Sequence, residues 1–220
     1  RFKCDWSSDV CSSDLSLALW CGNNECDEGW KNWGWQKQYR YSKSDSARIS
    51  NDYVRLFEQK IPSWIRELDP TRPYWPSSPS IGWGHKESLR QGDSHYWGVW
   101  WGMEPFDSYD KKVGRFMSEY GFQSLPDYST QKKIAPDGEL NLQNSIIKFH
   151  QKHKTGFETI NSYLLHDYKM PENFRDYVYE SQLVQRDGMN RAIAAHRAAK
   201  PYCMGTLFWQ LNDSWRGFSW

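Results

Sequence analysis

The sequence predicts an α/β fold in which buried parallel strands alternate with helices. Short apolar runs recur along the 220 residues, separated by loops and by stretches with helical spacing. A glutamate follows or ends two of these runs: Glu25 comes after residues 17–21 and a break at residues 22–24, and Glu119 ends residues 115–119. Carboxylates at the ends of buried parallel strands occupy the position at which α/β barrels carry their chemistry. We therefore expect Glu25 and Glu119 to face each other across a pocket.

The expected strands are short and apolar. They span residues 17–21, 74–75, 95–101, 115–119 and 204–211. The run at residues 17–21 is almost unbroken, which is typical of a strand buried on both faces. Repeated strand, loop and helix units imply a parallel sheet with right-handed crossovers.

Helices are expected where apolar residues recur with helical spacing. The stretches are residues 52–68, 142–168 and 174–199. Pro62 predicts a kink or restart in the first helix, and Pro171 separates the other two. The glycine-rich residues 81–92 are expected to form a long surface loop.

Composition argues against several classes of protein. The net charge is +1 and no run of lysine and arginine exceeds two residues, so neither nucleic acid nor an anionic membrane is an expected partner. The mean hydropathy is −0.89 and no apolar run approaches the length of a membrane span, so the chain is expected to be soluble.

The aromatic and cysteine contents also guide the prediction. The chain has 14 Trp and 13 Tyr, whose flat rings with polar edges match the faces and hydroxyls of sugars. Core packing explains many such rings, but their clustering near both glutamates favours a binding role. The five cysteines form no C-x-x-C pair, so neither a zinc site nor a disulfide framework is expected. Cys21 and Cys203 lie in apolar runs and are expected to be buried.

Paired carboxylates among aromatic rings fit retaining glycoside hydrolysis. One carboxylate attacks the anomeric carbon, the other protonates the leaving oxygen, and the two lie about 5 to 5.5 Å apart. The nucleophile must stay ionised and needs donors nearby, whereas the acid needs an apolar setting. Because Arg115 and Tyr120 flank Glu119, and Glu25 follows an apolar run, we assign Glu119 as nucleophile and Glu25 as acid/base.

Five ordered motifs resemble the β-mannosidase branch of the family 2 glycoside hydrolases. They are W-C-G-N-N-E at residues 20–25, E-L-D-P-T-R-P-Y-W-P-S-S-P at 67–79, G-D-S-H-Y-W-G-V-W at 92–100, R-F-M-S-E-Y-G-F-Q-S at 115–124 and W-Q-L-N-D-S-W at 209–215. Any one of them would be unspecific, but five in the family's order are specific.

The resemblance implies a (β/α)8 TIM-barrel catalytic domain, of which residues 16–220 would be the C-terminal part, strands four to eight with their helices. Glu25 would end strand four as acid/base and Glu119 would end strand seven as nucleophile. The implied reaction is retaining exo-hydrolysis of terminal β-D-mannose from a β-mannoside or oligosaccharide, with a glycosyl-enzyme intermediate. No metal or organic cofactor is implied.

The resemblance also implies roles for neighbouring residues. Asn24 would bond the sugar 2-hydroxyl, a contact that strengthens in the transition state. Trp33 and Trp209 would line the subsite of the cleaved mannose, and Tyr96 would contact the nucleophile or the sugar; core packing is the alternative for all three. His95 is expected to be a hydrogen-bonded strand-end residue rather than a metal ligand.

Some features depart from the pattern. Trp101 stands where a polar residue, often His, is expected in the family. Residues 1–15, in which S-S-D occurs twice, are expected to be a non-native or disordered leader. Strands one to three would belong to a missing N-terminal part of the same chain, so we expect this polypeptide alone to be poorly folded and inactive. The alternative functions are a β-galactosidase or β-glucuronidase of the same family, or a non-catalytic carbohydrate-binding module.

Overall fold

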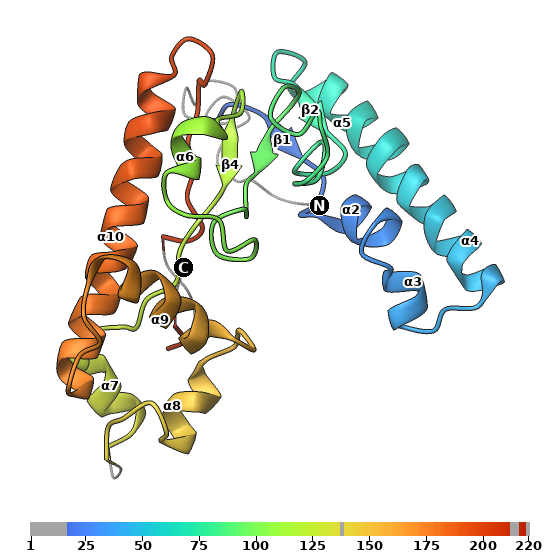
Figure 1. Ribbon diagram of the computed structural model, residues 1–220. Coiled ribbons are helices and arrows are strands. Elements are labelled where there is room, and N and C mark those ends of the chain that lie inside the picture. The colour runs from blue at the N-terminus through green and yellow to red at the C-terminus, as the bar shows by residue number, and fades with distance from the viewer. Residues whose placement is uncertain (1–16, 137–138, 212–215, 219–220) are drawn as a thin grey trace. The chain divides into compact units, whose positions relative to one another are not determined.

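The computed structural model describes residues 17–136, 139–211 and 216–218 (Figure 1). The chain divides into two compact units, one ending at Ser94 and one beginning at His95, and each is described by itself. The predicted leader at residues 1–15 lies outside the described residues, as do residues 212–215 of the last motif.

The sheet of the first unit is parallel. Strand β1 (Trp20–Cys21) pairs with β2 (Tyr74–Trp75), with Trp20 opposite Tyr74 and Cys21 opposite Trp75. A single bridge between Asn24 and Ser78 continues the pairing beyond the strands. Since parallel neighbours need a long connection, the helices between the two strands form the expected crossover.

Helices fill the connection between β1 and β2. They are α2 (Cys26–Lys31), α3 (Trp35–Gln38), α4 (Lys43–Tyr53), η1 (Val54–Lys60) and α5 (Ile61–Leu68), of which the last three form one continuous run (Figure 1). Ser42 caps this run by accepting a hydrogen bond of 3.1 Å from the Asp45 N–H. The run therefore begins nine residues before the predicted start at residue 52, in a stretch that is mostly polar.

The predicted irregularity at Pro62 is a π-helical segment, η1, of seven residues. The Ile61 N–H donates to the Leu56 carbonyl, five residues back. A proline has no N–H and its ring clashes with the carbonyl four residues earlier, so the α-helical pattern is interrupted just before it. The Phe57 carbonyl instead accepts a hydrogen bond of 2.7 Å from the Tyr74 hydroxyl, which ties the run to β2.

In the second unit, His95 ends strand β3 (Ser94–His95), which pairs with β4 (Met117–Glu119). The Tyr96 N–H donates to the Glu119 carbonyl at 2.8 Å. The prediction of a strand over residues 95–101 is wrong beyond His95, because the chain forms a turn there. The Gly102 N–H closes the turn on the Trp97 carbonyl at 3.0 Å, and the Trp100 side chain in this segment is buried.

Two strands that were expected to be buried are not. Residues 17–21 are half-buried or exposed, Cys21 among the exposed ones. Residues 204–211 make a single parallel bridge, between Thr206 and Met117, and Met204 and Leu207 are exposed, although Cys203 is buried as predicted. A strand is buried only where other elements cover both of its faces, and within the described residues these segments lie at the edge of a two-stranded pairing.

Helices make up most of the second unit. They are α6 (Ser108–Lys111), α7 (Tyr128–Ile134), α8 (Ser145–His150), α9 (Gly156–Asp167) and α10 (Phe174–Ala198). The helix predicted over residues 174–199 is confirmed by α10, which packs against α6, α7 and α9. The stretch at residues 142–168 is split into α8 and α9, because the Gln151 side chain accepts the His153 N–H at 3.0 Å and turns the chain.

The second unit has an aromatic core. Its largest fully buried side chains include Tyr96, Trp100, Tyr109, Tyr120 and Phe122. The protein thus mixes helices with short strands, as the predicted α/β class requires. Among the described residues, no helix combines the length and apolar character needed to cross a bilayer.

Candidate active site

Glu25 lies on a strained backbone at the start of α2. Its φ of 56° and ψ of 6° fall in the left-handed region, which residues other than glycine rarely adopt. Its N–H donates to the Ser78 carbonyl at 2.7 Å and its carbonyl accepts from the Gly29 N–H at 2.8 Å. Strained residues of this kind cluster at functional sites. The left-handed backbone conformation of Glu25, which is half-buried, is therefore of the kind found at functional sites.

Asn23 holds the turn before Glu25. Its side-chain oxygen accepts hydrogen bonds from the Cys26 N–H and the Ser77 hydroxyl, both at 3.0 Å. Its amide nitrogen donates to the Pro76 carbonyl at 2.8 Å and to the Tyr53 hydroxyl at 3.3 Å. The first asparagine of the motif is therefore structural, a role that the sequence interpretation did not assign.

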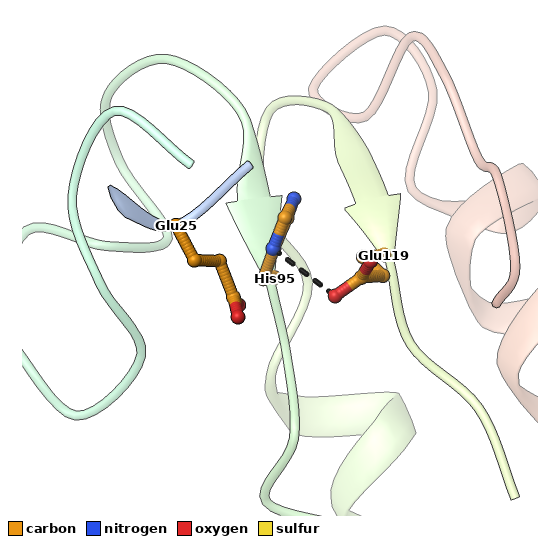
Figure 2. Close-up of side chains that lie close together, drawn as sticks. All are labelled: Glu25, His95 and Glu119. Carbon is orange, nitrogen blue, oxygen red and sulfur yellow. Dashed lines mark ion pairs between the residues drawn. The ribbon is translucent and has the colours of Figure 1, made fainter. Parts of the chain in front are cut away.

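Glu119 is a buried carboxylate at the end of β4. It is 7% exposed, and its Oε2 accepts a hydrogen bond of 3.0 Å from the Trp97 indole N–H. The same oxygen lies 3.1 Å from Nδ1 of His95, which is also buried (Figure 2). A buried carboxylate is costly unless such donors satisfy it. His95 is thus the hydrogen-bonded strand-end residue that the sequence predicted.

From the sequence, Arg115 and Tyr120 are predicted to donate hydrogen bonds to Glu119. The Arg115 guanidinium lies over the Tyr202 ring, 5.0 Å from its centroid. The Tyr120 hydroxyl pairs with Thr206 Oγ1 at 2.7 Å. Tyr120 follows Glu119 directly, and successive side chains of an extended segment point to opposite faces. The expectation that Arg115 and Tyr120 supply the donors is therefore wrong, and His95 and Trp97 replace them.

A sequence signal for Trp97 did exist. In H-Y-W, residues 95–97, alternation along an extended segment places His95 and Trp97 on one face and Tyr96 on the other. The Tyr96 side chain does not point to Glu119, because its hydroxyl donates to the Glu104 carboxylate. Burial and this hydrogen bond raise the pKa of Tyr96. Its link to Glu119 in the described structure is the backbone hydrogen bond.

The other predicted sugar-binding residues are exposed. Asn24 and Trp33 lie in the first unit, and the Trp33 ring meets Trp35 edge-on with centroids 5.8 Å apart. Trp209 lies in the second unit, where its N–H donates to the Tyr120 carbonyl at 2.8 Å. Trp33 is 49% and Trp209 is 39% exposed, so core packing within the described chain does not account for either ring.

Comparisons with known proteins give a consistent result. No family model matches the chain. Over 93% of its length it is 31% identical to Beta-mannosidase B of Thermothelomyces thermophilus and 30% identical to Beta-mannosidase B of Aspergillus oryzae. The chain spans 25% of each of these relatives. The crystal structure of a β-D-mannosidase from Dictyoglomus thermophilum superposes with a TM-score of 0.77 at 35% identity, over 94% of this chain and 24% of that one.

These similarities in sequence and structure relate the chain to the glycoside hydrolases. Within that class it is related to the β-mannosidases, and the resemblance indicated by its motifs is confirmed.

Proposed function

We propose that this chain forms the C-terminal part of the (β/α)8 catalytic barrel of a retaining exo-β-mannosidase. The observation that carries the proposal is Glu119, a buried strand-end carboxylate with nitrogen donors from His95 and Trp97, in a chain similar to β-mannosidases. Because the relatives are about four times as long, we expect activity in a longer protein that contains this chain rather than in the 220 residues alone.

The proposed mechanism is a double displacement. Glu119 attacks the anomeric carbon of the terminal mannose while Glu25 gives its proton to the glycosidic oxygen, which leaves with the rest of the glycan. Glu25 then takes a proton from water, the water attacks the anomeric carbon, and the bond to Glu119 breaks with net retention. The Trp97 N–H and the His95 nitrogen, which lie 3.0 and 3.1 Å from Oε2, hold the Glu119 carboxylate in position for the first step.

The surrounding residues would bind the sugar. Asn24 would donate to the 2-hydroxyl of the cleaved mannose, and the exposed rings of Trp33 and Trp209 would cover its apolar face. Tyr96, whose hydroxyl is held by Glu104, would support the end of β4 from its buried side.

The test replaces each carboxylate in the longer protein. With an activated aryl β-mannoside, Glu25→Ala plus azide should yield β-mannosyl azide, because azide attacks the glycosyl-enzyme in place of water. Glu119→Ala plus azide should yield α-mannosyl azide, because azide replaces the nucleophile itself. Glu58→Ala, an exposed glutamate in η1, is the matched control and should keep full activity.

Two outcomes would overturn the proposal. One is near-normal hydrolysis by Glu119→Ala, and the other is the same azide anomer from both variants. Faster cleavage of an aryl β-galactoside or β-glucuronide than of the β-mannoside would instead favour the related activities. Sugar binding without any hydrolysis would favour a carbohydrate-binding module, and hydrolysis by the 220 residues alone would contradict the need for a longer chain.

A further inference from the structure

A loop of residues 97–104 follows β3 in the second unit. Its first residue is Trp97, whose indole N–H donates to the proposed nucleophile. Backbone hydrogen bonds fold the loop back on itself: the Gly102 N–H donates to the Trp97 carbonyl at 3.0 Å, and the Glu104 N–H donates to the Gly98 carbonyl at 2.9 Å. The position of Trp97 therefore depends on the conformation of the whole loop.

The backbone of this loop is strained at two residues. Trp100 and Met103 have left-handed conformations, with φ of 78° and 54°. Residues other than glycine rarely adopt this region, and a residue as bulky as tryptophan is a genuine outlier there. Such conformations persist where the surrounding structure fixes them, and they are common at functional sites. The loop therefore needs contacts from outside itself to keep its shape.

Tyr163 of α9 supplies such contacts. Its hydroxyl oxygen accepts the Trp100 N–H at 3.3 Å, and the hydroxyl donates to the Glu104 carbonyl at 2.5 Å. One side chain thus bonds the loop at its strained residue and at its end. Burial raises the pKa of Tyr163 to about 12, so the hydroxyl keeps its proton and donates throughout the neutral pH range.

The Tyr163 ring is itself held by the aromatic core. Its centroid lies 5.0 Å from that of Phe106 and 4.8 Å from that of Phe122. Trp100 also packs edge-on against Phe122, with centroids 5.2 Å apart, and is buried. Since interiors are close-packed, the Tyr163 hydroxyl has a fixed position from which to restrain the loop.

We propose that Tyr163 is a positioning residue of the reaction, which holds Trp97 in place to donate to Glu119. It acts through the loop, because its hydroxyl bonds the backbone at Trp100 and Glu104. The inference rests on the proposed function, because it takes Glu119 as the nucleophile. It adds to the site a residue of α9 that the mechanism above does not use.

The test is Tyr163→Phe in the longer protein, which keeps the ring and removes the hydroxyl. The kcat for an aryl β-mannoside should fall about three- to tenfold, because the loop loses two hydrogen bonds and holds the Trp97 donor less firmly. KM should change less than about twofold, since no contact with the sugar is removed.

Tyr177→Phe is the matched control. Tyr177 is buried in the same unit, and its hydroxyl donates to Asn161 of α9 at 2.6 Å. The control removes a tyrosine hydroxyl bond without touching the loop. It should lower stability in urea denaturation about as much as Tyr163→Phe does, and it should leave kcat unchanged.

A double-mutant cycle separates positioning from a purely structural role. In the Trp97→Phe background the indole donor is already absent, so adding Tyr163→Phe should lower kcat less than about twofold. The same three- to tenfold loss in both backgrounds would overturn the inference, because Tyr163 would then not act through Trp97. An unchanged kcat in the single variant Tyr163→Phe would overturn it as well.

A second variant covers the case in which Tyr163→Phe does not fold. Pro105→Ala frees the backbone directly after the Glu104 carbonyl without removing a buried polar group. This variant should lower kcat in the wild-type background and leave it unchanged in the Trp97→Phe background. An equal effect in both backgrounds, or no effect in either, would contradict the inference.

A crystal structure of Tyr163→Phe in the longer protein gives a readout that does not depend on hydrolysis. A longer protein that is inactive before any substitution would refute the proposed function, and the structure would still decide whether Tyr163 positions Trp97. The distance between Trp97 Nε1 and Glu119 Oε2, now 3.0 Å, should lengthen beyond about 3.5 Å, the limit of a hydrogen bond. An unchanged distance would overturn the inference.

Discussion

Trp97 donates its indole N–H to Glu119, with Nε1 lying 3.0 Å from Oε2. The donor comes from the turn after β3 and the acceptor from the end of β4, so the hydrogen bond crosses between two segments of the second unit. His95 Nδ1 lies 3.1 Å from the same oxygen. Residues at and just after the end of β3 therefore hold one oxygen of the proposed nucleophile, and the Glu119 side chain is almost completely buried.

Trp97→Phe keeps an aromatic ring and removes this donor. A hydrogen bond to a charged group contributes about 1.5–3 kcal/mol, so kcat of the longer protein for an aryl β-mannoside should fall about 10- to 100-fold. KM should change little, because the lost contact is to the nucleophile and not to the sugar. Trp64→Phe is the control, and an unchanged kcat in Trp97→Phe would exclude a role of the indole N–H.

Glu25 gives a prediction about stability. A non-glycine residue in the left-handed region costs about 1–3 kcal/mol, and asparagine tolerates this region better than glutamate does. Glu25→Asn should therefore raise the free energy of unfolding by roughly 1 kcal/mol while it abolishes hydrolysis. Urea denaturation of the longer protein measures the first effect and an aryl β-mannoside the second.

The matched control for this prediction is Glu58→Asn. Glu58 lies in the helical run, where asparagine is a poorer helix former, so this variant should be slightly less stable than wild type. If Glu25→Asn is also less stable, the glutamate backbone is not a source of strain.

The two candidate carboxylates could be selected from the sequence, but the residues that donate hydrogen bonds to Glu119 could not be predicted from it. Strand-end position and motif wording singled out Glu25 and Glu119, because both depend on residues that are adjacent in the chain. The donors to Glu119 come from more than 20 positions away, at His95 and Trp97. Proximity in sequence suggested Arg115 instead, which lies over Tyr202.

Helices were easier to predict than strands for a similar reason. The spacing in residues 174–199 depends on one helix face, and α10 confirms it. An apolar run such as residues 204–211 indicates a buried strand only if other elements cover it, and covering is a tertiary property. The start of α4 was missed because its first turns carry a cap, Ser42, but no apolar stripe.

His196 makes the stability of the second unit depend on pH. Burial lowers the pKa of His196 to about 4, against 6.5 for an exposed histidine. Between these values the unfolded chain binds a proton that the folded chain does not, so stability is full above pH 6.5 and falls as the pH drops toward 4. The loss should be on the order of 3 kcal/mol.

Urea denaturation at several pH values between 4 and 7 checks this effect. His196→Gln removes the titrating group, so its stability should fall less steeply over the range. His153→Gln is measured alongside, because burial lowers the pKa of His153 as well. Equal pH dependence in wild type and His196→Gln would show that His196 is not responsible.

Thr206 connects the buried histidine to the strand that ends in the proposed nucleophile. Its hydroxyl oxygen lies 2.8 Å from His196 Nδ1 and 2.7 Å from the Tyr120 hydroxyl oxygen. Tyr120 follows Glu119, and its carbonyl accepts the Trp209 N–H at 2.8 Å. We infer that this network holds the segment that carries Trp209 against the end of β4.

Thr206→Val keeps the shape of the side chain but leaves Tyr120 and His196 without their shared partner. Stability should fall by about 1–3 kcal/mol, the cost of leaving buried polar groups unpaired. KM for an aryl β-mannoside should rise more than kcat falls, because Trp209 is expected to bind the sugar rather than react with it. Thr206→Ser retains the hydroxyl and should restore both stability and KM. If Thr206→Val loses stability but leaves KM unchanged, the network supports the fold without positioning Trp209.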